Sequence, residues 1–124
     1  MYKVIRIKMI TKFKDILRAF LLTSNEKNIF LTGSSHLSLA KFNYDKITNL
    51  DEVDFKIFSQ FGEDGILDFL FFKLNIKKPK FLEIGIGDYR ECNTRYIYER
   101  NPCKGMVIDR NKDLKKKVLR NVKL

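Results

Sequence analysis

The chain from residue 80 onward alternates apolar runs with helical segments, and this alternation constrains the fold more than any other feature. Residues 80–84 ("KFLEI") and 105–108 ("GMVI") each indicate a short strand. Residues 93–100 ("NTRYIYER") and 111–120 ("NKDLKKKVLR") indicate helices. Strand, helix, strand, helix is the order that builds a parallel sheet with right-handed crossovers. The predicted fold class is therefore α/β, with adjacent parallel strands.

A glycine-rich turn follows the first predicted strand. Its sequence is "EIGIGDY", residues 83–89. Open parallel sheets bind ligands at this place, beyond the carboxyl ends of the strands. Gly85 and Gly87 lack a Cβ, so a ligand can contact their backbone directly. The next helix, which Asn93 or Thr94 is placed to cap, points its free N–H groups the same way.

The residues around this turn favour one class of cofactor. A dinucleotide fingerprint requires Gly or Ala at the position that Arg90 occupies, so a nicotinamide-dependent oxidoreductase is the weaker alternative. The negative charge of Glu83 would also face a diphosphate. Asp109 lies 22 residues after Gly87 at the end of the second strand, where an acid can accept hydrogen bonds from two ribose hydroxyls. An adenosine ligand without a pyrophosphate fits, and S-adenosylmethionine is such a ligand.

Three sequence blocks in this region resemble the start of FkbM-like, class I S-adenosylmethionine-dependent methyltransferases. The blocks are "SQFGEDGIL", "FLEIGIGDYRECNTR" and "GMVIDRN", and the resemblance covers residues 58–111. It implies a partial Rossmann-like methyltransferase fold preceded by an N-terminal helical segment. It further implies S-adenosylmethionine as the cofactor and O-methylation of a sugar or polysaccharide precursor.

The resemblance also implies which residues contact the cofactor. Glu83, Gly85 and Gly87 would line its methionine and ribose parts, and Asp109 would hold the ribose hydroxyls. The remaining candidates are Asp88, Asn93 and Thr94 near the methionine end, and Gln60, Glu63 and Asp64 in the block before the first strand. Structural roles stay open beside these: a tight turn for the glycines, a strand-end acid for Asp109, and helix capping for Gln60, Glu63 and Asp64. No catalytic base is identified.

The domain organisation follows from the extent of the resemblance. Residues 58–124 are predicted to be the N-terminal portion of the cofactor-binding domain, and residues 1–57 a helical or irregular extension. The family's sheet has seven strands, whereas this chain offers two. We therefore expect a truncated or split reading frame, or a fragment of a longer enzyme, and we expect the 124-residue chain alone to lack methyltransferase activity. The alternative is a non-catalytic remnant or small interaction module whose basic ends dock on a partner or a membrane.

The N-terminal extension is predicted to begin with a helix near Thr11. Turn-prone residues at 23–28 predict its end, 29–33 reads as a strand and 34–38 as a loop. His36 is the chain's only histidine and is expected in that loop without a catalytic role. The helix carries an apolar stripe and either packs at a domain edge or makes weak contact with a membrane surface. The stripe consists of Phe13, Ile16, Leu17, Phe20 and Leu21.

Residues 59–74 predict a second helix that is apolar on both faces and so should be covered on both sides. The charged residues Arg90, Glu91 and Arg95 are expected to be solvated. Cys92 is expected to be a small filler beside the turn, with no base placed to activate it.

The charge and the cysteine content limit which partners and which kinds of site are expected. The net charge of +10 is concentrated at the two ends, yet no aromatic residues interleave a basic stripe, so no nucleic acid partner is expected. Cys92 and Cys103 form no CxxC and have no histidine-rich surroundings, so neither a disulfide framework nor a metal site is predicted. We therefore expect a cytoplasmic protein, and the resemblance implies a small-molecule or glycan substrate. No apolar run reaches the roughly 18 residues of a membrane span.

Overall fold

A computed structural model describes residues 2–101 and 103–122. The chain divides into two compact units, residues 1–32 and 33–124. The domain boundary predicted between residues 57 and 58 falls inside the second unit. Helices combine with a two-stranded parallel sheet in the described residues, which agrees with the α/β class.

The first helix, α1 (Tyr2–Ala40), is longer than the sequence predicted. It begins well before Thr11 and continues through residues 23–28, so both predicted ends were wrong. The Thr23 hydroxyl donates a hydrogen bond to the carbonyl of Ala19 at 2.8 Å. A hydroxyl that bonds to the preceding turn is accommodated inside a helix, so the polar stretch does not end α1.

The strand predicted at 29–33 and the loop at 34–38 are also wrong, because both segments belong to α1. A short apolar run fits a strand and a buried helix equally well, which explains the error. Gly33 lies where α1 closely approaches a neighbouring segment: a Cβ at this position would be 2.6 Å from Cγ1 of Ile57. His36 accordingly lies on the helix and not in a loop.

The first unit is described by α1 alone. Ile16, Leu17, Phe20 and Leu21, which the sequence places on one stripe, are all exposed. Phe13, the remaining member of that stripe, lies outside the residues whose side chains the structure describes.

The second unit continues with η1 (Lys41–Lys46), η2 (Leu50–Val53) and α2 (Glu63–Lys73). α2 lies within the predicted helical segment. Phe69 is buried and packs with Tyr44 and Val53 in a small core. Phe72 is 43% exposed, so the prediction that α2 is covered on both sides is wrong for this position.

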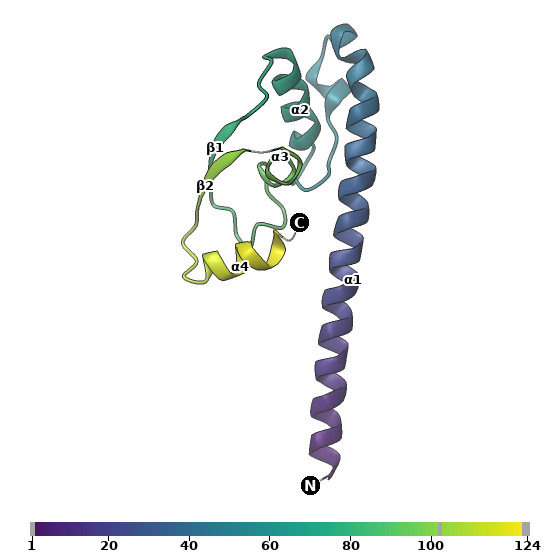
Figure 1. The fold of residues 1–124 in the computed structure, drawn as a ribbon, viewed down its shortest axis with the longest axis vertical. Coiled ribbons are helices and arrows are strands. Elements are labelled where there is room, and N and C mark those ends of the chain that lie inside the picture. The colour runs from purple at the N-terminus through teal and green to yellow at the C-terminus, as the bar shows by residue number, and fades with distance from the viewer. Residues whose placement is uncertain (1, 102, 123–124) are drawn as a thin grey trace. The chain divides into compact units, whose positions relative to one another are not determined.

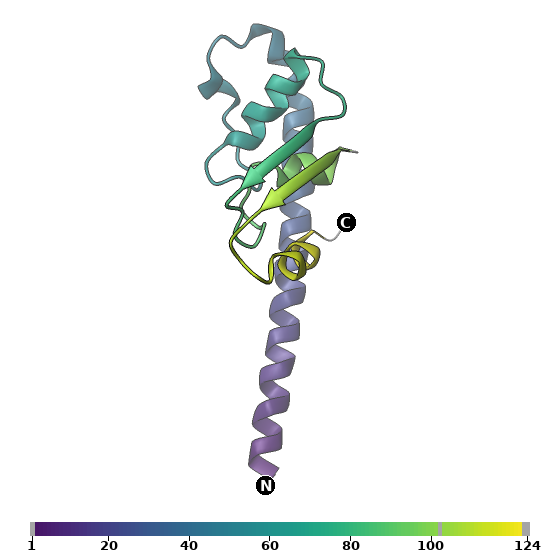
Figure 2. The same ribbon diagram turned by 90° about the vertical axis from the view of Figure 1, so that its left-hand side faces the viewer.

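The sheet pairs β1 (Lys80–Ile84) with β2 (Lys104–Ile108) in parallel, and the connection between them contains α3 (Arg95–Arg100). Figure 2 shows the two strands side by side and pointing the same way. The predicted parallel pairing and the crossover helix are thus confirmed. Pro102, which the sequence assigns to the turn before β2, lies outside the described residues.

The two faces of this sheet differ. α2, α3 and the last helix, α4 (Leu114–Asn121), lie on the same side of it (Figure 1). Successive side chains of a strand point to opposite faces. The side chains on the other face are therefore left exposed in the described structure, and the apolar ones among them belong to Leu82, Ile84, Met106 and Ile108.

Two clusters connect the helices to the sheet and its loops. Leu114 and Val118 of α4 pack against the buried Ile86, Tyr89 and Cys92, which surround the glycine turn. This contact fixes the segment after β1 against the helix after β2.

The second cluster is polar. The Tyr44 hydroxyl donates to Oδ2 of Asp68 at 2.9 Å, and Oδ1 of Asp68 accepts from Arg100. Lys41 Nζ lies 3.4 Å from the same carboxylate. A single buried acid of α2 thereby holds η1 and α3.

Candidate functional site

The glycine turn leaves the carboxyl end of β1 with its backbone open to solvent. Gly85 has a φ of 81° and Gly87 a φ of 60°, a region that residues with a side chain rarely adopt. A Cβ at either position would meet nothing within 4 Å. The glycines are thus required by the backbone conformation and not by crowding, and a ligand has room to approach.

Asp109, directly after β2, closes the turn. Its Oδ2 accepts a hydrogen bond from the backbone N–H of Gly87 at 2.8 Å, and its Oδ1 accepts one from Asn111 N–H at 2.8 Å. These two bonds, that from Gly87 first, hold the pKa of Asp109 below its ordinary value. Each oxygen of an ionised carboxylate has a second lone pair, so Asp109 can still accept hydrogen bonds from a ligand.

Glu83 points from β1 to the start of α3. Its carboxylate accepts hydrogen bonds from the backbone N–H groups of Asn93 at 3.0 Å and Thr94 at 3.1 Å, and from the Thr94 hydroxyl. It therefore caps α3 from a neighbouring strand, whereas the sequence assigned capping to Asn93 or Thr94 themselves. The Thr94 side chain makes no capping bond in the described structure.

The segment after Gly87 is tightly held. Asp88 accepts from the N–H of Arg90 at 3.1 Å, and its carbonyl accepts from the Asn121 side chain of α4 at 2.6 Å. Tyr89 has a positive φ of 65°, which is uncommon for a bulky residue and costs conformational energy. Its buried hydroxyl lies 3.1 Å from the hydroxyl of Thr94.

Cys92 is buried beside this segment. Its Sγ lies 3.3 Å from the carbonyl oxygen of Ile86, and burial raises the pKa of the thiol to about 12. A thiol with so high a pKa is a poor nucleophile. The expected role of Cys92 as a filler beside the turn is confirmed.

Arg95 is a residue whose role sequence reasoning missed, because the expected solvated side chain is only 2% exposed. Its guanidinium lies 3.9 Å over the ring of Phe58 and donates to the carbonyl oxygens of Arg90 and Asn121 at 3.1 Å each. It also pairs with Glu99 at 2.8 Å. The spacing of Arg95 and Glu99, four residues apart on a helix, was the one available signal. Arg95 joins the turn, α4 and the segment before α2.

The block before α2 contains the candidates Gln60, Glu63 and Asp64. Asp64 is fully buried, and its Oδ2 accepts three backbone N–H groups at 2.6–2.7 Å from the segment 57–59. Glu63 Oε2 accepts from the backbone N–H groups of residues 61 and 62, which is a capping arrangement. Burial raises the pKa of Asp64. These acids shape the loop that precedes α2.

Gln60 and the glycine-turn segment are brought together by one lysine. Lys56 Nζ lies 3.0 Å from the Gln60 carbonyl oxygen and 2.7 Å from Oε1 of Glu91. Glu91 and Arg90 are exposed, as expected. The first resemblance block therefore lies next to the chain that follows the turn, while the Gln60 side chain itself is exposed.

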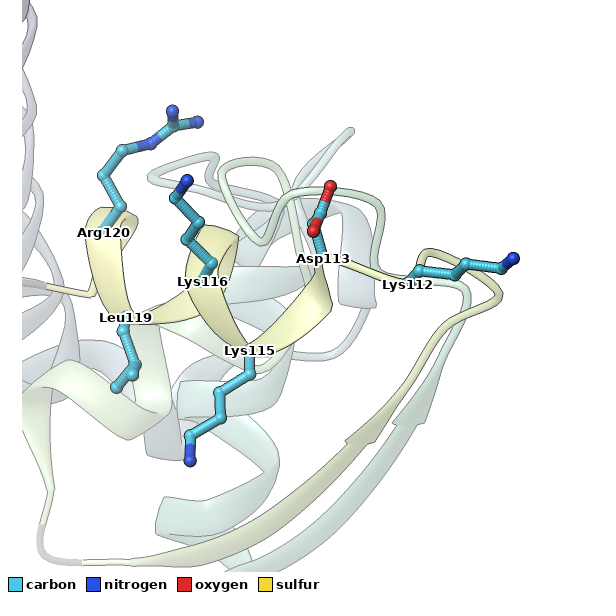
Figure 3. Close-up of a pocket in the computed structure, with 6 residues that line it drawn as sticks. All are labelled: Lys112, Asp113, Lys115, Lys116, Leu119 and Arg120. Carbon is cyan, nitrogen blue, oxygen red and sulfur yellow. The ribbon is translucent and has the colours of Figure 1, made fainter.

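Two cavities lie away from the glycine turn. A shallow one of about 540 Å³ is formed along α4, and Figure 3 shows its cationic side chains pointing in different directions. Its lining consists of Lys112, Asp113, Lys115, Lys116, Leu119 and Arg120. The other, of about 290 Å³, includes His36 and Tyr44. Among the described residues, no three His, Cys, Asp or Glu side chains gather closely enough to hold a metal ion.

Neither the search for membrane-spanning helices nor the comparison with known proteins assigns a function to the chain. Within the described part of the chain, α1 and the other helices contain no stretch long and apolar enough to cross a membrane. No family model, no curated protein and no solved structure matches this chain.

Proposed function

We propose that residues 58–124 form the first part of a Rossmann-like, S-adenosylmethionine-binding domain of the FkbM-like methyltransferase type. One observation carries this proposal: two positive-φ glycines and an ionised acid meet at the carboxyl ends of adjacent parallel strands. Asp109 is joined to Gly87 there by a 2.8 Å hydrogen bond. Open α/β sheets bind nucleoside ligands at such an edge.

The charges around the turn favour this cofactor over a dinucleotide. Glu83, Asp88 and Asp109 all lie in or beside the turn, and Arg90 occupies the third-glycine position. Three carboxylates repel a pyrophosphate and attract the sulfonium and ammonium groups of S-adenosylmethionine. The open space at Gly85 and Gly87 lets a ligand contact the backbone. The residues of the turn therefore fit this cofactor.

Each proposed contact uses acceptor or donor capacity that the fold leaves open. Asp109 accepts the ribose hydroxyls with its second lone pairs, and the backbone of Gly85 and Gly87 borders the ribose and methionine parts. Glu83 accepts from the backbone N–H groups of Asn93 and Thr94 at the start of α3, and we assign this segment to the methionine end. Lys56 links the segment of Gln60 and Glu63 to the chain after the turn, because it contacts both the Gln60 carbonyl oxygen and Glu91. The cofactor supplies an electrophilic methyl group, and these residues bind and orient it.

The acceptor is proposed from the resemblance alone: a hydroxyl of a sugar or polysaccharide precursor. Oxygen acceptors need alignment with the methyl group and removal of a proton. The high thiol pKa of Cys92 rules against this residue as the base.

The test is an amide NMR titration of the 124-residue chain with S-adenosylhomocysteine, with NADH as the competing ligand class. We expect the amides of Gly85, Gly87 and Asp88 to shift with S-adenosylhomocysteine and to stay unchanged with NADH. Asp109→Asn should weaken binding about tenfold through the lost charge-assisted hydrogen bonds. Asp113→Asn makes the same change at an exposed acid of the next segment and should alter binding less than about twofold. Shifts caused by NADH, or none with millimolar S-adenosylhomocysteine, would contradict the proposal.

A second candidate function is a non-catalytic interaction module, and the α4 surface favours it. Lys112, Lys115, Lys116 and Arg120 are exposed and accompanied by the single acid Asp113. Such a surface attracts acidic partners. Binding of an acidic partner that is abolished by Lys115→Glu and Lys116→Glu, together with no response to S-adenosylhomocysteine, would favour this candidate.

A further inference from the structure

The first unit presents a short apolar stripe on α1. Ile16, Leu17, Phe20 and Leu21 are spaced so that they lie on one side of the helix. All four are exposed, and Phe20 is 68% exposed. Exposed apolar side chains gathered on one side of a helix favour burial against another surface.

Positive charge accompanies this stripe. Lys14 and Arg18 are exposed, and each precedes a residue of the stripe by three positions, so that Lys14 lies beside Leu17 and Arg18 beside Leu21. Residues 1–22 contain six Lys or Arg and a single acid, Asp15. An apolar stripe bordered by cations is complementary to a surface with an apolar interior and anionic groups above it.

We propose that the α1 segment of residues 14–22 lies along an anionic phospholipid surface. Phe20 and its three neighbours in the stripe enter the boundary between headgroups and acyl chains, and Lys14 and Arg18 contact the lipid phosphates. Interfacial helices bind through this combination of apolar burial and charge attraction. The helix lies in the plane of the surface.

A second copy of the chain is the competing occupant, and the sequence disfavours it. Ser24 and Lys27 stand seven residues after Leu17 and Phe20, where a helix pair would require the stripe to continue. A parallel pair of α1 helices would also bring the like charges of Lys14 and Arg18 from both chains close together. A lipid surface meets neither difficulty.

Tryptophan reporters test the orientation of the helix. The chain has no Trp, so Phe20→Trp and Leu22→Trp each provide a single fluorophore. Two residues turn an α-helix by about 200°, so position 22 faces away from the stripe. We expect a blue shift of Phe20→Trp with vesicles of phosphatidylcholine containing about one quarter phosphatidylglycerol, and a much smaller one for Leu22→Trp. Equal shifts at both positions, or none at either, would overturn the proposal.

Vesicle co-sedimentation of the full chain tests the energetics. Phe20→Glu should lower the membrane-binding constant about tenfold or more, since it removes the aromatic ring proposed to enter the bilayer and adds one negative charge. Leu22→Glu makes the same charge change at an exposed apolar residue of the opposite side, and should lower it less than about threefold. Circular dichroism checks that both variants stay folded. Equal losses, wild-type affinity for phosphatidylcholine alone, or a stripe-dependent dimer in sedimentation equilibrium without vesicle binding would each refute it.

Discussion

Asp109 and Gly87 lie 22 residues apart and are joined by a hydrogen bond of 2.8 Å, from the glycine N–H to the carboxylate. The bond ties the turn after β1 to the end of β2. The other oxygen of the same carboxylate accepts from the Asn111 N–H. Both oxygens of the proposed ribose acceptor are therefore fixed by backbone hydrogen bonds. The proposed binding edge is thus held together by hydrogen bonds within the chain.

The first prediction concerns the pH dependence of this pairing. The backbone bonds lower the pKa of Asp109 below its ordinary value of 3.8. A depressed pKa means that the ionised group stabilises the fold above 3.8 and that this contribution is lost as the pH falls through the folded value. The amide proton shifts of Gly87 and Asn111 should therefore titrate together, with a midpoint below 3.8. A common midpoint at or above 3.8 would contradict the hydrogen bonds.

The second prediction concerns backbone conformation at Gly87. Gly87→Ala should lower the free energy of unfolding by about 1 kcal/mol, because a Cβ disfavours a positive φ. Gly87→Asn should cost less, since Asn tolerates that region better. Gly105→Ala is the steric comparison, because its Cβ would lie 2.1 Å from the ring of Phe81. It should cost about 1–3 kcal/mol. Urea unfolding in which Gly87→Ala equals the wild type would argue against the φ of 60°.

The third prediction concerns the hydrogen bonds of Arg95 to the carbonyl oxygens of Arg90 and Asn121. Arg95→Lys keeps the charge but cannot reach the carbonyls of Arg90 and Asn121 together, so it should destabilise the fold by about 2 kcal/mol. Faster hydrogen exchange at the Tyr89 amide, which bonds to the Ile86 carbonyl, should accompany the loss. Arg110→Lys, at an exposed arginine, should change stability by less than about 0.5 kcal/mol. Equal stability and equal exchange rates in the two variants would contradict a stabilising role for the buried Arg95.

The fourth prediction concerns Asp68, whose carboxylate accepts from Tyr44 and Arg100. Asp68→Asn leaves Arg100 without its buried partner and should cost about 2–4 kcal/mol in the free energy of unfolding. Asp45→Asn removes an ion pair with Lys73 in which the Asp45 side chain is 85% exposed. That variant should cost less than about 1 kcal/mol. Thermal or urea denaturation measures both, and similar losses would show that burial does not decide their values.

The fifth prediction concerns thiol reactivity. With Cys103→Ser in place, Cys92 is the only thiol. Its pKa of about 12, raised by burial, predicts modification by a disulfide reagent at pH 8 at least about a hundredfold slower than a free cysteine. Urea should restore the ordinary rate. Rapid labelling of the folded chain would place Cys92 in an accessible, activated setting.

The sequence by itself determined the elements around the turn. The runs 80–84 and 105–108 were separated by a helical segment, and that order allows few arrangements besides adjacent parallel strands. The glycines at 85 and 87 marked the turn between them. These features depend on local pattern and on chain connectivity, which a single sequence contains.

The tertiary structure alone decided what the charged side chains do. Arg95 and Asp64 are charged residues of types that are usually solvated. Both are buried here, because folding brings backbone groups together as their hydrogen-bond partners. Backbone groups carry no signature in a sequence, so no pattern could have located them. The continuation of α1 through residues 29–38 also depends on tertiary contacts. Gly33 leaves room there for the side chain of Ile57, which packs closely against the helix. Local propensity is worth a few tenths of a kcal/mol per residue, and such packing contacts outweigh it.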